Sequence, residues 1–188
     1  MATDTLLDIP TAVSQLQAGH VIAYPTEAVY GLGCDPFNET AVRKLLSLKG
    51  RQASAGFVLI ASDFSQLKPW IADIDDVLLE RAMASWPGPV TWLFPRAAGV
   101  ADYVAGDHDT IAVRITAHET SHTLCKAFES ALISSSANHT SAPPARSAGE
   151  VEDYFGHFLG GILKGPLGGS ERPSEIRDLL SGKVIRKG

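Results

Sequence analysis

Apolar and polar residues follow two different periods along this chain, and together they predict alternating helices and strands. Apolar residues spaced three and four positions apart predict helices over residues 11–18, 39–48, 75–86 and 118–128. A five-residue apolar run predicts a strand over residues 57–61, and further short segments rich in apolar residues predict strands over residues 21–24, 90–94, 110–115, 132–135 and 184–186. Because helices and strands alternate, we expect an α/β layer structure.

The connections around residues 95–109 and 139–147 are long and irregular, and loops of this length in a compact protein are often functional. No internal repeat and no low-complexity linker divides the sequence. A chain of 188 residues is long enough to bury its own core. We therefore expect one domain over residues 1–188.

The composition is that of an ordinary globular protein, with 45% apolar and 20% charged residues. No apolar run approaches the ~18 residues that a membrane span needs, and MATDTLLDIP lacks the basic residue that opens a secretory signal. Cys34 and Cys125 have no metal-type spacing, so reduced thiols are expected. These features predict a cytoplasmic protein without a membrane partner.

The charge is negative overall but unevenly distributed. A net charge of −5 and a pI of about 5.6 argue against the basic coat that many nucleic-acid-binding proteins carry. Residues 63–80 contain five acidic residues and one lysine, whereas residues 172–187 contain five basic and two acidic residues. Such a chain can still gather cations at one site and attract anions there.

The segment HETSH, residues 118–122, matches the H-E-x-x-H pattern of zinc proteases. On a helix it would place two imidazoles one turn apart, with Glu119 as the general base. However, the match has only three fixed positions, and no third histidine follows. Glu119 also stands at a helix start, where it complements the helix dipole. We therefore expect no metal site formed by protein side chains.

YPTEAVYGLGCDP, residues 24–36, carries a predicted strand directly into a polar loop that contains two glycines. GLG is half of a dinucleotide-binding fingerprint, but Pro36 stands where the third glycine would be, and no phosphate-binding loop of the GK[ST] type is present. Gly31 and Gly33 are interpreted as a turn with positive φ, or as bends that return the chain toward the helix at 39–48.

Two polar segments at the ends of predicted elements have both a structural and a functional interpretation. Lys49 and Arg51 in LKGR either complement a helix C-terminus or form a cationic loop for phosphates. SSSAN, residues 134–138, follows a short strand, and its hydroxyls and amide either form a turn or serve as neutral donors for a ligand.

Arg114 lies inside the apolar strand IAVRI, and Arg186 lies in VIRKG. An arginine in a strand core needs an anionic partner, which is either a protein carboxylate or a ligand. PSEIRD, residues 173–178, can be read as a helix start with Ser174 as its N-cap.

Taken together, these segments resemble one family. YPTEAVYGLGCDP, LKGR, WPGPVTWLFP, AVRIT, SSSAN, GGSERPSEIRD and VIRKG occur in the order seen in the YrdC/TsaC family, the threonylcarbamoyl-AMP synthases. The resemblance covers about residues 10–188 and is to the short bacterial form. Each segment alone is a weak signal, and the specificity comes from their number and order.

The resemblance implies an α/β fold with a twisted mixed β-sheet and flanking helices around a concave, positively charged site. It implies that the enzyme, a nucleotidyltransferase, joins L-threonine, bicarbonate and ATP into threonylcarbamoyl-AMP and pyrophosphate. Other proteins then transfer the threonylcarbamoyl group to the adenosine next to the anticodon of tRNA. The implied cofactor is Mg²⁺ that accompanies ATP, and tRNA or double-stranded RNA and the transfer proteins are further implied partners.

The resemblance also implies roles for individual residues. No single acid or base is implied, and Lys49 and Arg51 would act electrostatically on the phosphates. The residues that would bind threonine are Thr26, Arg114 and Ser174. Those that would bind ATP are Lys49, Arg51, Ser136, Asn138 and Arg186.

The chain departs from the family pattern after the Lys-x-Arg pair. Many relatives have a proline and a further lysine there, where this sequence has Gln52 and Ala55. The loop is therefore less rigid and has one positive charge fewer. Arg146, in the 139–147 connection, is the candidate to replace that charge.

A non-catalytic RNA-binding module that acts in ribosome or tRNA maturation is the alternative function. It predicts salt-dependent RNA binding without an AMP-containing product. The acidic pI and the lack of a stripe of basic and aromatic residues weigh against it.

Overall fold

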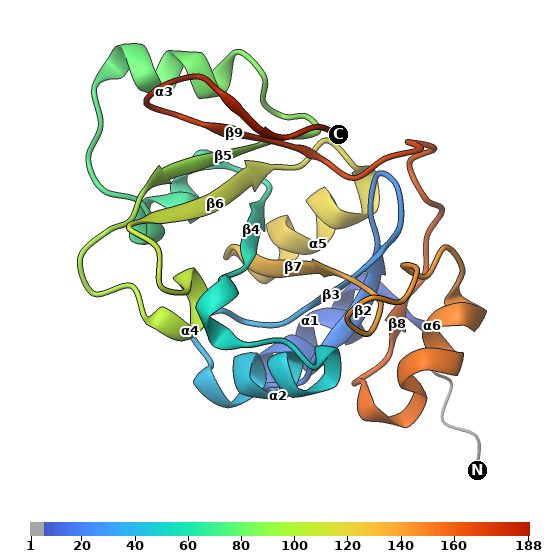
Figure 1. Cartoon of the computed structure of the whole chain (residues 1–188). Coiled ribbons are helices and arrows are strands. Elements are labelled where there is room, and N and C mark those ends of the chain that lie inside the picture. Colours follow the sequence, from blue (N-terminus) through green and yellow to red (C-terminus); the bar gives the residue numbers. More distant parts are fainter. Residues whose placement is uncertain (1–5) are drawn as a thin grey trace.

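A mixed β-sheet of ten strands forms the centre of the molecule, with helices packed on both of its faces (Figure 1). The computed structural model describes residues 6–188. Within these residues, no helix has both the length and the apolar character needed to cross a bilayer. The helices on both faces of this sheet confirm the α/β layer structure that the sequence predicts.

The strands are β1 (Leu6–Leu7), β2 (Ile22–Pro25), β3 (Tyr30–Gly33), β4 (Val58–Ala61), β5 (Val90–Pro95), β6 (Thr110–Ile115), β7 (Leu132–Ser136), β8 (Ile162–Leu163), β9 (Glu175–Asp178) and β10 (Val184–Arg186). The α-helices are α1 (Ile9–Gln17), α2 (Glu39–Lys49), α3 (Asp76–Met83), α4 (Asp102–Ala105), α5 (Glu119–Phe128) and α6 (Ala148–Phe155). The described residues also contain three 3₁₀ helices: η1 (Ala53–Ala55), η2 (Phe64–Trp70) and η3 (Gly156–Phe158).

The strand order across the sheet is β1-β8-β2-β3-β7-β4-β6-β5-β9-β10. β4 and β6 run parallel to each other, and so do β5 and β9, whereas β7 pairs in the antiparallel sense with both β3 and β4. Segments that are far apart in the sequence therefore become neighbours in the middle of the sheet. This arrangement places the ends of β3, β7, β4, β6 and β9 close to one another.

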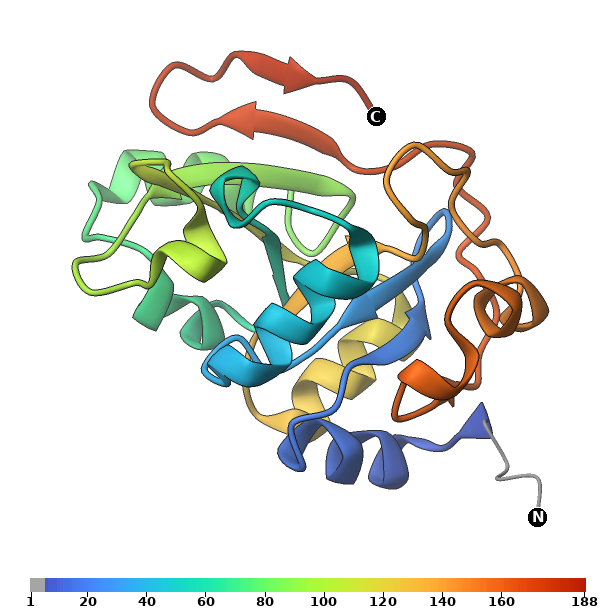
Figure 2. The ribbon, with the colours of Figure 1, turned by 60° about the horizontal axis from the view of Figure 1, so that its bottom comes forward.

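Successive residues of the central strands point to opposite faces of the sheet, as a pleated strand requires. On β4, Ile60 belongs to an apolar cluster with α1 and α5, while Leu59 belongs to the larger cluster that includes Val42 and Leu45 of α2. Figure 2 shows α2 in front of the strands and α5 behind them. Burial on both faces explains why these strands read as continuous apolar runs in the sequence.

Local signals fix the ends of α2. Asn38 caps its N-terminus by accepting a hydrogen bond from Ala41 N at 3.1 Å, and Gly50 ends it in the left-handed conformation with φ of 59°. The predicted helix 39–48 is therefore confirmed to within one residue. The helix predicted over residues 75–86 is shorter in the structure, because α3 ends at Met83.

The interpretation of residues 173–178 as a helix start is wrong. These residues lead into β9, which pairs parallel to β5, with Ile176 opposite Thr91. Ser174 does not cap a helix, and its hydroxyl instead lies 3.0 Å from the Thr91 hydroxyl. The strand pairing is non-local, so the polar residues that suggested a cap carried no information about it.

The interpretation of Gly31 and Gly33 as a positive-φ turn or as bends is also wrong. Both lie in β3, and neither has positive φ. At Gly33, a Cβ atom would lie 2.3 Å from the Ile133 carbonyl oxygen and 2.7 Å from the Tyr24 ring. The Tyr24 hydroxyl donates to the same carbonyl at 3.0 Å. Glycine is required here because β3 passes close to its neighbours.

Gly33→Ala is therefore expected to lower the free energy of unfolding by about 1–3 kcal/mol, the usual cost of overpacking a core. The added methyl group meets a backbone oxygen, which cannot rotate away. Gly149→Ala is the matched control, because it adds the same group to helix α6, where the nearest atom, the Ser147 hydroxyl oxygen, is 3.9 Å away. Chemical denaturation of both variants tests this, and equal stabilities would contradict the packing argument.

Candidate active site

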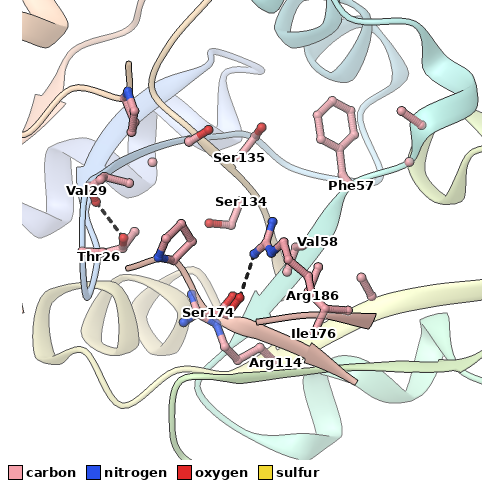
Figure 3. A pocket seen from close by; sticks show the side chains of 18 of the residues that line it. Thr26, Val29, Phe57, Val58, Arg114, Ser134, Ser135, Ser174, Ile176 and Arg186 are labelled. Atoms are coloured by element: carbon pink, nitrogen blue, oxygen red, sulfur yellow. Dashed lines mark hydrogen bonds between the residues drawn. The ribbon is translucent and has the colours of Figure 1, made fainter. Parts of the chain in front are cut away.

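A cavity of about 480 Å³ opens on the sheet between the β2–β3 turn and the β9–β10 hairpin (Figure 3). Its floor comes from β4, β6 and β7, where Val58, Ala112 and Ser134 are paired neighbours that line the cavity. These residues lie on the same face of their strands as Ile60 and Leu132, which pack in the cluster with α5. One end of this face is therefore core, and the other end is pocket.

Six of the residues predicted to bind substrate line this cavity, although they come from segments spread over most of the chain. They are Thr26, Arg51, Arg114, Ser136, Ser174 and Arg186. The sheet topology brings them together, because β3, β7, β4, β6, β5, β9 and β10 are consecutive in the strand order. Lys49 and Asn138, the other two predicted residues, do not line the cavity.

Thr26 occupies a tightly held turn between β2 and β3. Its hydroxyl donates to the Val29 carbonyl oxygen at 2.6 Å, as Figure 3 shows, and its backbone N–H donates to the same oxygen at 3.1 Å. Gly168 N donates to the Thr26 carbonyl oxygen at 3.0 Å from the other side. The hydroxyl oxygen of Thr26 keeps its capacity to accept a hydrogen bond from a ligand in the cavity.

Arg114 Nη1 forms an ion pair with Glu27 Oε1 at 2.9 Å. Arg114 as a whole is only 5% exposed. The Glu27 carboxylate also accepts a hydrogen bond from the Thr116 hydroxyl at 2.8 Å. Burial raises the pKa of Glu27, but the Arg114 charge and the Thr116 hydrogen bond outweigh it and hold this pKa below its ordinary value. Of the two partners considered for Arg114, the structure thus shows a protein carboxylate.

Arg114 nevertheless keeps unused hydrogen-bonding capacity, because its Nε atom is buried without an acceptor within residues 6–188. A guanidinium carries five N–H donors, and buried donors are normally satisfied. Arg114 is therefore the buried cation in this cavity with the clearest need for a further acceptor.

Arg186 and Ser174 bring the β9–β10 hairpin into the cavity. Arg186 Nη2 donates to the Ser174 carbonyl oxygen at 2.8 Å, which Figure 3 shows as a dashed line. Burial and the positive charge of Arg114 both lower the pKa of Arg186 from its ordinary value. The two guanidinium groups repel each other, and an anion bound between them would relieve this repulsion.

Arg51 also lines the cavity and lies in the connection between α2 and β4. Its Nη2 atom donates to the Ala55 carbonyl oxygen at 3.1 Å, and its guanidinium carbon lies 5.2 Å from the centre of the Phe57 ring. Burial lowers the pKa of Arg51. The loop that departs from the family pattern thus folds back on Arg51 and fixes the direction of its side chain.

Lys49 is 5% exposed, and its ammonium group is bonded to the segment that follows β7. Nζ donates to the Ser136 carbonyl oxygen at 2.5 Å, to the Asn138 carbonyl oxygen at 2.9 Å and to Asn138 Oδ1 at 3.4 Å. An ammonium group has three hydrogens, so these acceptors use all of them. Burial and repulsion by Arg51 lower the pKa of Lys49 to about 8.

Asn138 is the centre of this segment rather than part of the cavity wall. Its Oδ1 atom accepts from the Ser136 hydroxyl at 2.6 Å, and its Nδ2 atom donates to the carbonyl oxygens of His139 and Ala142 at 2.9 and 2.8 Å. Lys49 and Asn138 therefore shape the wall from behind. Direct contact of either residue with ATP stays a prediction.

Arg146 is exposed and does not line the cavity. The position of Arg146 therefore does not support the expectation that its positive charge replaces the one missing from the loop that contains Gln52 and Ala55. Ala55, one of the two positions at which the sequence is expected to depart from the family pattern, does line the cavity.

The HETSH segment forms the N-terminus of α5, with His118 as the N-cap. His118 Nδ1 accepts a hydrogen bond from Ser121 N at 3.3 Å, and Nε2 lies 3.0 Å from the Pro166 carbonyl oxygen. Both ring nitrogens are engaged in these contacts. Among residues 6–188, no three histidine, cysteine or acidic side chains come together as a metal-binding group.

The sequence reasoning missed Glu27 as a site residue and missed the apolar part of the wall, which includes Phe57, Ala112, Ile176 and Ile185. A signal for part of it was present. In the predicted strand 110–115, residues 110, 112 and 114 fall on one face, and all three line the cavity. Read as a set, this face would have pointed to a pocket instead of a core.

The cavity thus combines three arginines, several hydroxyl groups and an apolar wall, with Glu27 as the acidic residue among those that line it. Such a combination suits a ligand with two or more anionic groups and an apolar or aromatic part. Catalysis in it would rest on position and charge neutralisation, since the lining residues include no serine or cysteine paired with a base.

A profile of the Sua5/YciO/YrdC family, described as "Telomere recombination", matches residues 14–188. A threonylcarbamoyl-AMP synthase of Coxiella burnetii (strain RSA 493 / Nine Mile phase I) is 48% identical over 183 residues, which are 97% of this chain and 98% of the relative. The similarity therefore extends over nearly the whole length of both proteins.

Two solved structures have the same fold. Sua5 of P. abyssi in complex with L-threonine superposes with a TM-score of 0.85 at 30% identity, over 92% of this chain and 54% of that protein. This chain thus spans about half the length of that Sua5. E. coli YciO superposes with a TM-score of 0.85 at 22% identity, over 100% of this chain and 96% of YciO. The expected α/β fold with a mixed sheet is confirmed.

Proposed function

The chain belongs to the Sua5/YciO/YrdC family, and from this membership we propose that it is a threonylcarbamoyl-AMP synthase, a nucleotidyltransferase. It forms threonylcarbamoyl-AMP and pyrophosphate from L-threonine, bicarbonate and ATP. The observation that carries the proposal is the convergence of Arg51, Arg114 and Arg186 on one cavity, together with relatives of that name at close to 50% identity.

The proposed reaction is limited by repulsion among its substrates. The amine of threonine takes up CO₂ to form a carbamate, and a carbamate oxygen then attacks the α-phosphate of ATP and expels pyrophosphate. A carboxylate, a carbamate and a triphosphate must therefore be held close together. Fixed guanidinium groups and oriented hydroxyls offset that repulsion and align the attack, without an activated nucleophile from the protein.

We assign the two ends of the cavity to the two substrates. Thr26, Arg114 and Ser174 bind threonine, with Arg114 at its carboxylate. Arg51, Ser136 and Arg186 bind ATP, with Arg51 at the phosphates, where its planar guanidinium can contact two oxygens at once. Lys49 and Asn138 support the ATP end through the segment after β7.

We propose that Mg²⁺ enters with ATP and is bound by its phosphates and by water. Glu27 is the acidic residue that lines the cavity, and it is already engaged with Arg114 and Thr116. This donor set fits an ion carried by the nucleotide better than an ion bound by the protein. Bound there, Mg²⁺ would neutralise phosphate charge in the transition state.

The product would serve the threonylcarbamoyladenosine modification of tRNA in the cytoplasm, through proteins that transfer the group. The alternative, a non-catalytic RNA-binding module, makes no adenylate. Comparing RNA binding with product formation over a salt series would separate the two functions, because only RNA binding should weaken steeply with salt.

The direct test is an incubation of the purified chain with ATP, Mg²⁺, L-threonine and bicarbonate, followed by mass detection of the adenylate. We expect threonylcarbamoyl-AMP, and we expect pyrophosphate release to require both threonine and bicarbonate. ATP turnover at the same rate without threonine, or pyrophosphate release without the adenylate, would contradict the proposed function.

A further inference from the structure

Glu27 is out of place in a cavity built for anions. It is the acidic side chain among the lining residues, and its side chain is 16% exposed. A carboxylate in such a place repels every anion that enters, and burying it costs free energy. Its presence therefore calls for a role that offsets both costs.

The structure holds Glu27 from several sides. Its side-chain Oε1 atom accepts from Arg114 Nη1 at 2.9 Å and from the Thr116 hydroxyl at 2.8 Å. Its backbone carbonyl oxygen accepts from Ser170 N at 2.8 Å. A Cβ atom on Gly168 would lie 2.9 Å from Glu27 Cα, so the two backbones are in close contact. The carboxylate is thus fixed in position before any ligand arrives.

Both of these side-chain contacts end on Oε1, and Glu27 lines the cavity, so Oε2 is the carboxylate oxygen that neither Arg114 nor Thr116 uses. Arg114 shows the complementary situation. Its guanidinium is buried, its one ion pair is with Glu27, and its Nε atom has no acceptor in the described part of the chain. A fixed acceptor and a fixed donor group with unused capacity therefore stand side by side on the cavity wall.

The charges decide which ligand suits this pair. Glu27 and Arg114 together are neutral, so the pair by itself does not compensate a ligand with a carboxylate alone, and Arg186, which lines the same cavity, would have to do so. An α-amino acid in its zwitterionic form carries an ammonium group two bonds from its carboxylate carbon. It matches a neighbouring carboxylate and guanidinium charge for charge.

We propose that Glu27 and Arg114 form a zwitterion-recognition pair, in which Arg114 binds the carboxylate of the amino-acid substrate and Glu27 Oε2 accepts from its α-ammonium group. This inference rests on the proposed function, and it adds Glu27 as a specificity-determining residue. The proposal explains why Arg114 is paired with the Glu27 carboxylate although Arg114 also binds the carboxylate of the substrate.

Glu27 is suited to bind the ammonium group of the substrate but not to act as the base that deprotonates it. The Arg114 charge and the Thr116 hydrogen bond outweigh the effect of burial and keep the pKa of Glu27 below its ordinary value, so the residue stays ionised at neutral pH. A carboxylate of this kind binds an ammonium group well but takes its proton poorly. The ammonium group loses two protons when it becomes a carbamate with CO₂, one to give the free amine and one on addition of CO₂, and both therefore leave to water or bicarbonate.

The test is calorimetric binding of two ligands to the full chain, L-threonine and 2,3-dihydroxybutanoate, which has a hydroxyl group in place of the ammonium. Glu27→Gln keeps the shape of the side chain and removes its charge. We expect it to weaken threonine binding about 10- to 100-fold, the value of a hydrogen bond between charged groups. Binding of 2,3-dihydroxybutanoate should be unchanged or tighter, because a repelling charge is gone.

Glu27→Asp retains the charge and is expected to recover part of the threonine affinity. Asp153→Asn is the matched control, since it removes an exposed carboxylate on α6, away from the cavity, and should change neither affinity. Circular dichroism would confirm that each variant is folded at the temperature of the titration.

The outcomes distinguish the inference from the proposed function. Equal weakening of both ligands in Glu27→Gln would show that Glu27 only orients Arg114, and unchanged threonine binding would show that Glu27 does not contact the ligand. Either result would overturn the inference and leave the function standing. Failure of the unaltered chain to bind threonine at all would overturn both.

Discussion

Arg114→Met is expected to lower kcat/KM for threonine by about 100-fold or more, because it removes the guanidinium proposed to bind the threonine carboxylate. ATP affinity should change much less. Arg51→Ala is expected to show the reverse pattern, with the loss mainly in ATP affinity. Arg43→Ala, at an exposed arginine that pairs with Glu39 on the surface of α2, is the neutral control. Steady-state kinetics with threonine measures kcat/KM, and isothermal titration with each ligand measures the affinities of all three variants.

Arg114→Met should also lower the free energy of unfolding, because it leaves the Glu27 carboxylate without its ion-pair partner. Removal of one member of a buried pair costs about 3–5 kcal/mol. The sign of the pH dependence should also change. In the unaltered chain the pKa of Glu27 lies below 4.5, so its contribution is present above that pH and is lost as the pH falls through the folded value. Without Arg114, burial raises the pKa, so stability should instead fall as the pH rises above about 4.5.

The double variant Arg114→Met with Glu27→Met separates binding from folding. It replaces both charges by apolar groups, so most of the lost stability should return while threonine binding stays absent. Thermal unfolding at pH 5 and pH 8, together with threonine titration, gives both readouts. Recovery of threonine binding in the double variant would contradict the role of Arg114, and equal loss of both ligands in Arg114→Met would indicate general unfolding.

Lys49→Met is expected to lower the rate of ATP-dependent product formation about 10- to 100-fold, although Lys49 does not line the cavity. The carbonyl oxygens of Ser136 and Asn138 lose their shared donor, and the wall that carries Ser136 loses its fixed position. A displacement of about 1 Å at a reacting group can cost about 100-fold in rate.

Stability should change far less than activity in this variant. A pKa lowered from 10.5 to about 8 means that the folded state spends roughly 3 kcal/mol to hold Lys49 charged at neutral pH, at 1.36 kcal/mol per unit of pKa. Methionine removes this cost but leaves carbonyl acceptors unpaired, at about 1–3 kcal/mol each. The two effects oppose each other. A large fall in the free energy of unfolding with normal activity in the folded protein would contradict the positioning role.

The pKa of Lys49 also predicts a pH dependence of nucleotide binding. Above pH 8 the ammonium loses a proton, and the amine has only two hydrogens for three acceptors, so ATP affinity should decline with an apparent pKa of about 8. Because the folded pKa is below the unfolded one, the contribution of Lys49 to stability rises from pH 8 to pH 10.5, so this group causes no unfolding in that window. Lys49→Arg stays charged, and its ATP affinity should show no decline at this pH.

The parts of the fold that the sequence predicts are those governed by local chemistry and burial. The apolar stripe of α2, its Asn38 cap and its Gly50 stop give that helix nearly to the residue, and short segments rich in apolar residues give β4, β6 and β7. Helix α6 is missed, although Ser147 and Glu150 form a capping-box signature at its start. Its short length and its pair of buried apolar residues, Val151 and Phe155, give too little periodicity to recognise.

The parts that the sequence does not predict depend on contacts between distant segments. The sequence predicts a turn where β3 lies, because a glycine required by close packing between strands and a glycine required by a turn cannot be told apart in a single sequence. β9 reads as a helix start because its partner, β5, lies more than 80 residues earlier along the chain. In the site, the arginines stand out as charges in apolar strands, whereas Glu27 belongs to a polar loop, where a glutamate is ordinary.

The β9–β10 hairpin gives the site a place in the order of protein synthesis. Thr26 leaves the ribosome long before Ser174 and Arg186, which follow it by more than 140 residues. A domain generally folds as a unit, and β9 pairs with β5 inside this sheet, so the sheet lacks the strands next to the cavity until the hairpin that brings Ser174 and Arg186 has been synthesised. The cavity is therefore complete only after the hairpin has left the ribosome, and a growing chain without the hairpin lacks two of the residues proposed to bind substrates.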